Sequence, residues 1–426
     1  MNTRNRADCF FQPIHVFGLG QNLADLPPAW QRLIQTAEVI VAAERIQAVF
    51  PELHAERMLL QAPLEPILER LAQAAAQGRR VMVLVGGDPC FYGIGPLLAR
   101  RLGREHVVLH PGPTMVQAAA ALLGIAWQDV AVVSLHGRDA DATLFSRLAR
   151  YAWVAVYTDD NNTPSAVARH MLERGARDFA MWVFEDLGLP GQHHGKISLE
   201  QACEQSFSRL NLILLERLRE PEIRLSLGLD DQAYVHEQGL ITKRMTRAAA
   251  VAALRLEPAD VFWDLGAGCG SVGIEAGLLL PGGHVLAVER DVRRAAMIRD
   301  NIRRTHAFWV QVVQGVMPDC LALLPEPDRI FLGGGLGGGS IDEQADSDHV
   351  LKTAWNRLKP GGRLVASTVL LQSMHRVKTF LEHHGRDLEV IQVQASHGIA
   401  LARDLRLCAG NPVFLVCGNK AGQTGP

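Results

Sequence analysis

Short apolar runs alternate with longer segments of helical period along most of the chain. The runs are rich in Val, Ile and Leu, and the segments between them are rich in Ala, Leu and Arg. This alternation predicts βα units with mainly parallel sheets, because two neighbouring parallel strands need a crossover that is long enough to hold a helix. The predicted fold class is therefore α/β.

The candidate strands fall into two series with a polar stretch between them. In the first half they are residues 15–18, 38–41, 81–85, 107–109, 130–135, 153–157, 179–185 and 210–216. In the second half they are residues 261–265, 284–289, 310–313, 329–332, 363–367, 389–393 and 413–417. We expect a first domain over 13–218, a linker over 219–239, and a second domain over 240–420 that begins with a helix near 246–256.

Composition narrows the class of protein. The chain has 426 residues, is 48% hydrophobic, and carries a formal net charge of −2 from 43 basic and 45 acidic side chains. This balance, with only 6% aromatic residues, gives no support to a nucleic-acid or membrane partner. The seven cysteines are odd in number and widely spread, which is typical of free thiols in a reducing compartment. We expect a cytoplasmic protein with no metal site.

A glycine turn in the second half is the first candidate ligand loop. Gly266, Gly268 and Gly270 follow a predicted strand, and the next strand ends at Glu289. Glycines let a backbone turn tightly and approach a ligand, and a carboxylate at the following strand end can accept hydrogen bonds from both hydroxyls of a ribose. The pattern therefore predicts a nucleotide-type cofactor.

Three details favour S-adenosylmethionine over a dinucleotide. Asp264 precedes the loop, where it can meet the amino-acid end of S-adenosylmethionine but would repel a pyrophosphate. Ser271 stands where the dinucleotide fingerprint has its third glycine. The last two predicted strands, 389–393 and 413–417, are close in sequence, as in a seven-stranded sheet with a reversed last strand. A dinucleotide site and a structural turn without ligand remain the alternatives.

The first half has different candidate loops, each at the carboxyl end of a predicted strand. They lie at residues 17–20, 85–93, 110–117, 134–138 and 157–164. Open α/β sheets bind ligands at this edge. In the second of these loops Asp88 can accept hydrogen bonds from a ligand, although a turn-capping aspartate is the alternative. His136 can be either a proton carrier or a structural histidine.

Two further segments of the second half can face a substrate. Thr242 either caps the next helix or touches a cofactor, while Lys243, Arg244 and Arg247 can bind carboxylates. The alternative for this segment is an ordinary capped helix with a solvated basic face. The glycine-rich run 333–340 follows a strand, and we interpret it as a wall without side chains that a flat substrate could approach.

Both halves resemble known methyltransferases. The first resembles the tetrapyrrole methylases through GLG (18–20), GGDPxxYG (86–93), PGPTMVQAAAA (111–121), SLHGR (134–138), TDDNNTP (158–164) and VFEDLG (183–188). The second resembles the methyltransferases that act on carbon 15 of the corrin precursor, through ITKRMTR, DLGAGCGSVGIEA, AVERD, NIRR and LGGG. Together the chain resembles the fused, decarboxylating precorrin-6Y C(5,15)-methyltransferases. The resemblance implies a class III tetrapyrrole-methylase domain of two α/β subdomains, followed by a Rossmann-like seven-stranded class I domain.

The resemblance also implies residues and partners. Two S-adenosylmethionine sites are implied in each chain, the first at Gly18, Gly20, Gly87, Asp88, Tyr92, Thr114, Met115 and His136, and the second at Thr242, Gly266, Ala267, Gly268, Cys269, Gly270, Glu289 and Met317. We expect Arg138, Lys243, Arg244 and Arg247 to bind the carboxylates of a tetrapyrrole. No catalytic residue is assigned, and a homo-oligomer is expected.

The implied reaction is methylation of carbons 5 and 15 of precorrin-6Y with loss of an acetate carboxyl group, which gives precorrin-8X in cobalamin biosynthesis. A methyltransferase that acts on another substrate such as RNA is the main alternative, since both architectures are shared with such enzymes. A nicotinamide-dependent oxidoreductase is a second alternative.

Overall fold

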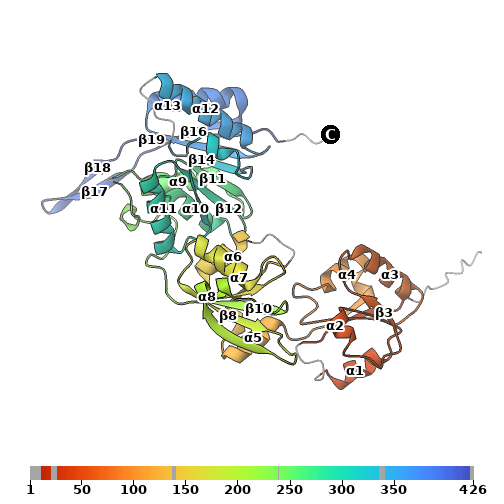
Figure 1. The fold of residues 1–426 in the computed structure, drawn as a ribbon. Helices are drawn as coiled ribbons and strands as arrows, with labels where there is room; N and C mark the ends of the chain where they lie inside the picture. The colour runs from red at the N-terminus through yellow and green to blue at the C-terminus, as the bar shows by residue number, and fades with distance from the viewer. Residues whose placement is uncertain (1–10, 21–25, 137–140, 238, 335–340, 423–426) are drawn as a thin grey trace, which may run out of the picture.

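A computed structural model of the chain describes residues 11–20, 26–136, 141–237, 239–334 and 341–422. Three units follow one another along the chain, and each is a β-sheet with helices packed on it (Figure 1). The first two units make up the first half of the chain, and the second of them lies between the first and the third (Figure 1). The α/β fold class is confirmed.

The first subdomain is a parallel five-stranded sheet with helices on both faces. Its strand order is β3-β2-β4-β1-β5. Val39 and Val41 face one helix layer, whereas Ile40 faces the other, because successive side chains of a strand point to opposite faces. The elements are β1 (Ile14–Gly18), α1 (Pro28–Gln35), β2 (Val39–Ala42), α2 (Glu44–Gln47), β3 (Glu56–Leu59), α3 (Glu65–Ala76), β4 (Val81–Val85), α4 (Gly95–Leu102) and β5 (Val107–His110).

The second subdomain is a mixed five-stranded sheet in the order β6-β7-β10-β8-β9. β10 runs antiparallel to both of its neighbours, β7 and β8, and β9 is antiparallel to β8. The elements are α5 (Met115–Leu123), β6 (Val130–Ser134), α6 (Asp141–Arg150), β7 (Trp153–Tyr157), α7 (Pro164–Glu173), β8 (Phe179–Glu185), β9 (His193–Ser198), α8 (Leu199–Glu204) and β10 (Asn211–Arg217).

The second domain contains a seven-stranded sheet in the order β13-β12-β11-β14-β15-β19-β16. β19 is antiparallel to both β15 and β16, so the predicted reversed strand is confirmed. The elements are α9 (Arg244–Leu254), β11 (Val261–Leu265), α10 (Ser271–Ala276), β12 (His284–Glu289), α11 (Val292–Thr305), β13 (Val310–Gln314), β14 (Arg329–Leu332), α12 (Ile341–Arg357), β15 (Arg363–Thr368), α13 (Leu371–His384), β16 (Arg386–Val393), β17 (Ser396–Leu401), β18 (Asp404–Ala409) and β19 (Val413–Asn419).

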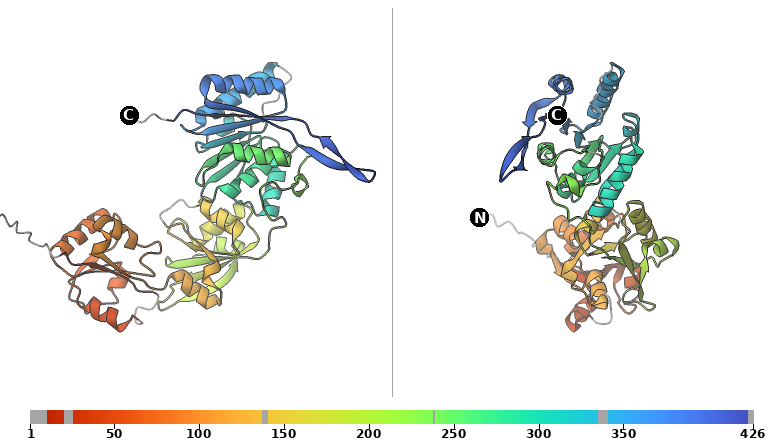
Figure 2. Two further views of the ribbon diagram at one scale, coloured as in Figure 1. Left: turned by 180° about the vertical axis from the view of Figure 1, so that it is seen from behind. Right: turned by 90° about the vertical axis from the view of Figure 1, so that its left-hand side faces the viewer.

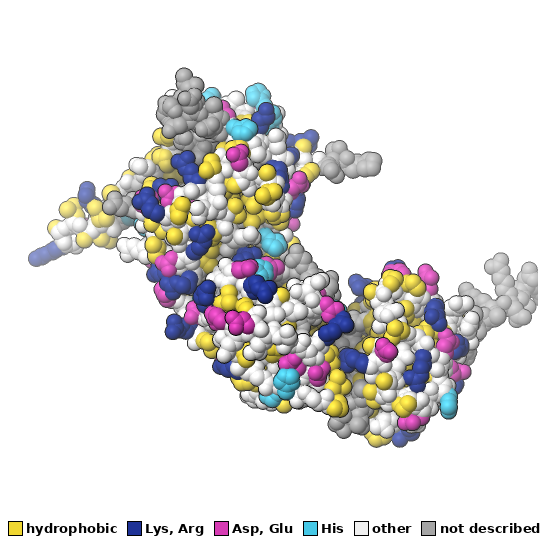
Figure 3. Space-filling view, in the orientation of Figure 1, with side chains coloured by type: hydrophobic (Ala, Val, Ile, Leu, Met, Phe, Trp, Pro, Cys, Tyr) yellow, Lys and Arg dark blue, Asp and Glu magenta, His cyan; other side chains and the backbone are white. Residues whose placement is uncertain are grey.

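The hairpin of β17 and β18 projects from the second domain and was not predicted. It stands away from the sheet in the views of Figures 1 and 2, and both of its strands are exposed along their whole length. Its side chains in Figure 3 are a mixture of apolar, basic and polar types. Leu401, Leu405 and Leu407 are among its exposed apolar residues.

The second subdomain and the second domain share one continuous apolar core. The rings of Phe179 and Phe308 meet at a centroid distance of 6.0 Å, nearly edge to face. Arg150 Nη2 donates a hydrogen bond to the carbonyl of Leu278 across the same junction, at 2.7 Å. The two halves are therefore joined by packing as well as by the chain.

The segment predicted as a linker belongs in part to the second domain. Tyr234 is buried, and the backbone N–H of Val235 donates to Asn301 Oδ1 at 2.8 Å. The C-terminal part of the predicted linker 219–239 therefore packs on the second domain, because a buried polar side chain of that domain binds its backbone. Among the described helices, none has the length and apolar character needed to cross a membrane.

The shared core leads to a stability prediction. Phe308→Ala removes a buried ring at the junction, and we expect it to lower the free energy of unfolding by about 3–5 kcal/mol. Leu323→Ala is the control, because Leu323 is 95% exposed. Urea unfolding followed by fluorescence measures both variants, and equal stability of the two would contradict a packed junction.

Candidate functional site

Three glycine-bearing loops meet at the carboxyl edge of the first sheet. They follow β1, β4 and β5, which are neighbours in the order β4-β1-β5. A Cβ added at Gly18 would lie 2.3 Å from the carbonyl oxygen of Gly87 and 2.7 Å from the nitrogen of Gly112. Gly20 and Gly87 also form an isolated β-bridge. The structure thus brings together Gly18, Gly20 and Gly87, and no side chain larger than hydrogen fits at Gly18.

Asp88, Thr114 and Met115, which are also predicted for the first site, lie on these same loops. Asp88 Oδ1 accepts a hydrogen bond from the backbone N–H of Cys90 at 2.7 Å, which is the turn-capping interaction. Thr114 is the N-cap of α5 and forms a capping box with Gln117, so that Met115 is the first residue of the helix. Asp88 and Thr114 therefore shape the loops in addition to any contact with a ligand.

The loop after β4 also reaches the second subdomain. Tyr92 Oη donates to the carbonyl of Val132 at 3.4 Å, and its ring lies 5.9 Å from the ring of Tyr157. His136 is exposed at the end of β6, and its Nδ1 lies 3.3 Å from the carbonyl oxygen of Thr158. The edges of the two sheets thus face the same region, while Arg138 lies outside the described residues.

The glycine loop of the second domain lies at the carboxyl edge of its sheet, over the neighbouring strands β12, β11 and β14. A Cβ at Gly266 would meet the backbone of Gly334 at 2.7 Å, and one at Gly270 would meet Ile298 at 2.8 Å. Gly268 has a positive φ of 60°, and a Cβ there would point into open space. Backbone groups at Gly268 can therefore approach a ligand that comes from outside the loop.

Glu289 supports this loop from the end of β12. It is buried, and its Oε2 accepts a hydrogen bond from the backbone N–H of Gly268 at 2.9 Å. Its Oε1 accepts a hydrogen bond from the backbone N–H of Asp291 at 3.0 Å. Each carboxylate oxygen has capacity for a further hydrogen bond, so Glu289 can also bind a diol. Met317 lies on the adjacent loop after β13, where the N–H of Gly315 donates to the carbonyl of Glu289.

Asp264 lies beneath the glycine loop and not at its open side. Its side chain is buried, and Oδ2 accepts a hydrogen bond from the N–H of Gly273 in the first turn of α10, at 2.9 Å. Burial raises the pKa of Asp264 to about 7. In this position Asp264 anchors the helix that follows the loop. The expected direct contact of Asp264 with the amino-acid end of S-adenosylmethionine is not supported.

The basic residues at the start of α9 divide into exposed and buried ones. Lys243 and Arg244 are exposed. Lys243 lies next to Asp231, and Arg244 Nη1 lies 2.8 Å from Asp230 Oδ1. Arg247 is fully buried and makes an ion pair with a buried carboxylate. The prediction that Arg247 binds substrate is therefore wrong for this arrangement, since its guanidinium is used inside the protein.

Three residues that sequence reasoning did not select support these loops. Gly112 packs directly on Gly18. It lies within the motif PGPTMVQAAAA (111–121), but the motif alone does not indicate this contact. Glu275 and Asn301 are buried polar side chains of the second domain. A glutamate or asparagine within a helical segment gives no sequence signal of burial, because its partners come from distant segments.

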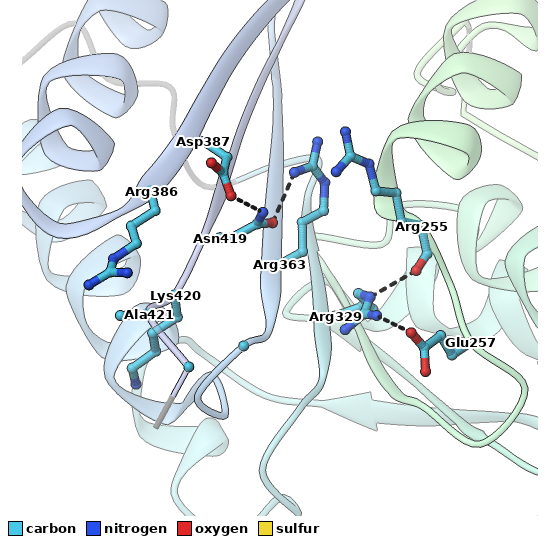
Figure 4. Close-up of a pocket in the computed structure, with 11 residues that line it drawn as sticks. Arg255, Glu257, Arg329, Arg363, Arg386, Asp387, Asn419, Lys420 and Ala421 are labelled. Atoms are coloured by element: carbon cyan, nitrogen blue, oxygen red, sulfur yellow. Dashed lines mark hydrogen bonds and ion pairs between the residues drawn. The ribbon is translucent and has the colours of Figure 1, made fainter. Parts of the chain in front are cut away.

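A cavity of about 420 Å³ lies at the opposite, amino edge of the seven-stranded sheet (Figure 4). Four of its cationic side chains, those of Arg255, Arg329, Arg363 and Lys420, are engaged within the protein. Arg363 binds Glu389 and Asn419, Arg329 lies near Glu257, and Lys420 donates to three backbone carbonyls at the end of α12. The cavity is remote from both sets of glycine loops, and its charges serve to hold strand ends together.

Comparison with known proteins identifies both halves. The family model described as Tetrapyrrole (Corrin/Porphyrin) Methylases matches residues 13–203, and the one described as Precorrin methyltransferase domain matches residues 232–413. Together they span most of the described chain.

Two curated relatives match this chain over most of its length, and a solved structure matches about half of it. The precorrin-6Y C(5,15)-methyltransferase [decarboxylating] of a Sinorhizobium species is 34% identical over 87% of this chain and 87% of its own length. The protein of the same name from Mycobacterium tuberculosis strain CDC 1551 is 31% identical over 84% of this chain and 88% of its own. The crystal structure of precorrin-6y C5,15-methyltransferase from Geobacter metallireducens GS-15 is 34% identical, covers 46% of this chain and 99% of that one, and has a TM-score of 0.42.

The raised pKa of Asp264 predicts a specific pH dependence of stability. Between the ordinary carboxyl pKa of about 4 and about 7, the folded chain keeps a proton that the unfolded chain releases, so stability falls as pH rises through this window. Asp264→Asn stays neutral, and we expect its stability relative to the unsubstituted chain to rise by about 4 kcal/mol across the window.

Urea unfolding at a series of pH values measures this difference. A stability difference that does not change between about pH 4 and pH 7 would show that Asp264 is ionised in the folded chain.

Proposed function

Because the chain belongs to the family of decarboxylating precorrin-6Y C(5,15)-methyltransferases, whose methyl donor is S-adenosylmethionine, we propose that it holds two molecules of this donor, one in each half. The first half methylates carbon 5 of precorrin-6Y. The second half methylates carbon 15 and removes the acetate carboxyl group, which gives precorrin-8X. The observation that carries the proposal is the presence of two unlike glycine-loop clusters at the carboxyl edges of two separate sheets.

The first cluster supports a site built from backbone groups. Gly18, Gly87 and Gly112 pack against one another without side chains between them, and Gly18 and Gly87 are buried. This packing brings the partly exposed parts of the same loops, such as Asp88 and Thr114, to one surface that a ligand would contact. Tyr92 and Tyr157 extend this surface toward the second subdomain. We propose that Gly18, Gly20, Gly87, Asp88, Tyr92, Thr114, Met115 and His136 border the first donor site.

The second cluster offers the groups that an adenosyl ligand requires. The open direction at Gly268 leaves room for the ligand beside the loop, and Glu289 can accept hydrogen bonds from ribose hydroxyls. The residues present therefore fit the donor. We propose that Thr242, Gly266, Ala267, Gly268, Cys269, Gly270, Glu289 and Met317 border this second site.

The reaction mainly requires the protein to align the methyl donor with the carbon that accepts the methyl group. S-adenosylmethionine supplies a methyl group that its sulfonium already activates. The loops of this chain hold the donor and the electron-rich carbon of the tetrapyrrole in line, and they exclude water. The macrocycle can accept the electrons that decarboxylation releases, so the chain needs to bind and orient the acetate group.

The exposed cations Lys243 and Arg244 are proposed substrate ligands. They are the N-cap and the first residue of α9, and they lie beside acidic partners that are themselves exposed or half-buried. Ion pairs of this kind are weak in water, so a carboxylate of the tetrapyrrole can replace Asp230 or Asp231. The homo-oligomer and the absence of nucleic-acid partners stay predictions, as does the role of Arg138.

Glycine substitutions separate the two proposed sites. Gly18→Ala forces a Cβ against backbone atoms of the first cluster, and we expect it to abolish carbon-5 methylation. Gly268→Ala places a strained Cβ in the space proposed for the donor, and we expect carbon-15 methylation to fall by about a hundredfold or more. Mass spectrometry of the products from precorrin-6Y and labelled S-adenosylmethionine counts each methyl group and the lost carbon dioxide.

Two matched glycines control for backbone strain. Gly124 and Gly361 have φ values of 66° and 79°, with open space where a Cβ would stand. Gly124→Ala and Gly361→Ala therefore carry a strain similar to that of Gly268→Ala, away from the proposed sites. Gly18 has no positive φ, and Gly18→Ala acts through the contact of its Cβ with backbone atoms. If either control lost the same methyl group as its partner variant, the assignment of that loop would be wrong.

Salt dependence tests the proposed carboxylate clamp. In the double variant Lys243→Ala with Arg244→Ala, we expect KM for the tetrapyrrole at carbon 15 to rise about threefold to tenfold at low salt and less at high salt, because exposed ion pairs are screened. Steady-state kinetics at two ionic strengths measures the effect. An unchanged KM at low salt would remove these two residues from the substrate site.

A further inference from the structure

Buried polar side chains connect the segment before α9 to the glycine loop of the second domain. The glycine loop is defined as residues 266–270, and the preceding segment as the described residues 228–237 and 239–242. Hydrogen bonds and ion pairs between them converge on Arg247, Glu275 and Asn301, each of which is at least 99% buried. These residues are not part of the exposed surface, so their contacts act on other parts of the protein.

Glu275 is the centre of the first set of contacts. It lies on α10, the helix that starts directly after Gly270. Its carboxylate accepts hydrogen bonds from the N–H groups of Gly228 and Leu229, at 2.7 and 3.2 Å, and from Tyr234 Oη at 3.0 Å. The preceding segment is thereby tied to the helix that carries the glycine loop.

Arg247 completes this set from the other side. Its Nε donates to Glu275 Oε1 at 2.6 Å, and its Nη1 donates to the carbonyl of Thr242 at 2.6 Å. Its Nη2 donates to the carbonyl of Leu229. One guanidinium thus fixes both ends of the preceding segment relative to α10, including Thr242, which is a proposed donor-site residue.

Asn301 makes an independent connection from α11. Its Nδ2 donates to the carbonyl of Cys269, inside the glycine loop, and to the carbonyl of Val235, both at 2.9 Å. Its Oδ1 accepts from the N–H of Val235. A single amide therefore holds the loop and the preceding segment at a fixed separation.

We propose that Arg247, Glu275 and Asn301 are positioning residues of the second donor site, which hold Thr242 and the glycine loop in the relative arrangement that S-adenosylmethionine needs. This inference rests on the proposed carbon-15 site. A buried ion pair contributes less to stability than well-packed apolar side chains of similar size, so its contacts are better explained by the geometry that they fix. None of the three residues contacts the reacting atoms.

The test compares two kinds of variant with a neighbouring control. Asn301→Ala releases the loop without leaving a charge buried. The double variant Arg247→Met with Glu275→Gln removes both charges together and retains approximate volume, which avoids the strong destabilisation that one stranded charge causes. Asp300→Asn is the control, because Asp300 is the preceding residue on α11 and pairs at the exposed surface with Arg303.

Three measurements on the full chain give the outcome. Hydrogen exchange of the ligand-free chain reports the mobility of residues 228–236 and 266–270. Calorimetry with S-adenosylhomocysteine reports the affinity of each donor site. Product analysis reports methylation of carbon 15, with carbon-5 methylation by the same chain as the internal reference.

We expect faster exchange in both segments, second-site affinity weaker by about tenfold or more, and a carbon-15 rate lower by about tenfold to a hundredfold, in Asn301→Ala and in the double variant. The carbon-5 rate of the double variant should stay close to that of the unsubstituted chain, and the double variant should melt cooperatively as a folded protein. Asp300→Asn should match the unsubstituted chain in all three measurements.

Normal second-site affinity and carbon-15 rate in a folded double variant, or in Asn301→Ala, would overturn the positioning role. Failure of the proposed function itself would give a different result. The unsubstituted chain and Asp300→Asn would then bind one equivalent of S-adenosylhomocysteine and add one methyl group, and the positioning role would be contradicted as well.

Discussion

Direct contact between backbones, without intervening side chains, is the constraint on which both candidate sites depend. Parallel strands place their carboxyl ends at one edge, and the loops that leave neighbouring strands must then share a small volume. Gly18 shares that volume with Gly87 and Gly112, and Gly266 shares its own with Gly334. Gly18 and Gly87 are themselves buried, whereas Gly112, Gly266 and Gly334 are partly exposed, so this packing sets how closely the exposed parts of the loops approach one another.

The two halves meet this constraint with different supports. In the first, loop shape comes from local interactions such as the Asp88 turn and the Thr114 capping box. In the second, buried side chains fix the shape of the loop through contacts with residues that are distant in sequence. The contacts of Glu289, Glu275 and Asn301 are examples. The shared apolar core then fixes the second subdomain against the second domain. One chain can thus carry two unlike sites on a common framework.

Much of this arrangement could be predicted from the sequence, and the failures have physical causes. Residues 261–265 and 153–157 were predicted as strands with correct bounds, because continuous apolar runs mark strands buried on both faces. β9, with the sequence HHGKIS, carries no such run and was missed. The glycine loops could be placed after strands, but which glycines touch depends on strand order. Arg247 gave the signal of a surface cation, and only the fold reveals its buried partner 28 residues away.

The most direct test of two donor sites is the number of S-adenosylhomocysteine molecules that one chain binds. Calorimetric titration of the full chain gives this number without a tetrapyrrole substrate. Two equivalents with different affinities and enthalpies are expected, because the two loop clusters offer different groups to the ligand. A single equivalent per chain at saturation would contradict the account.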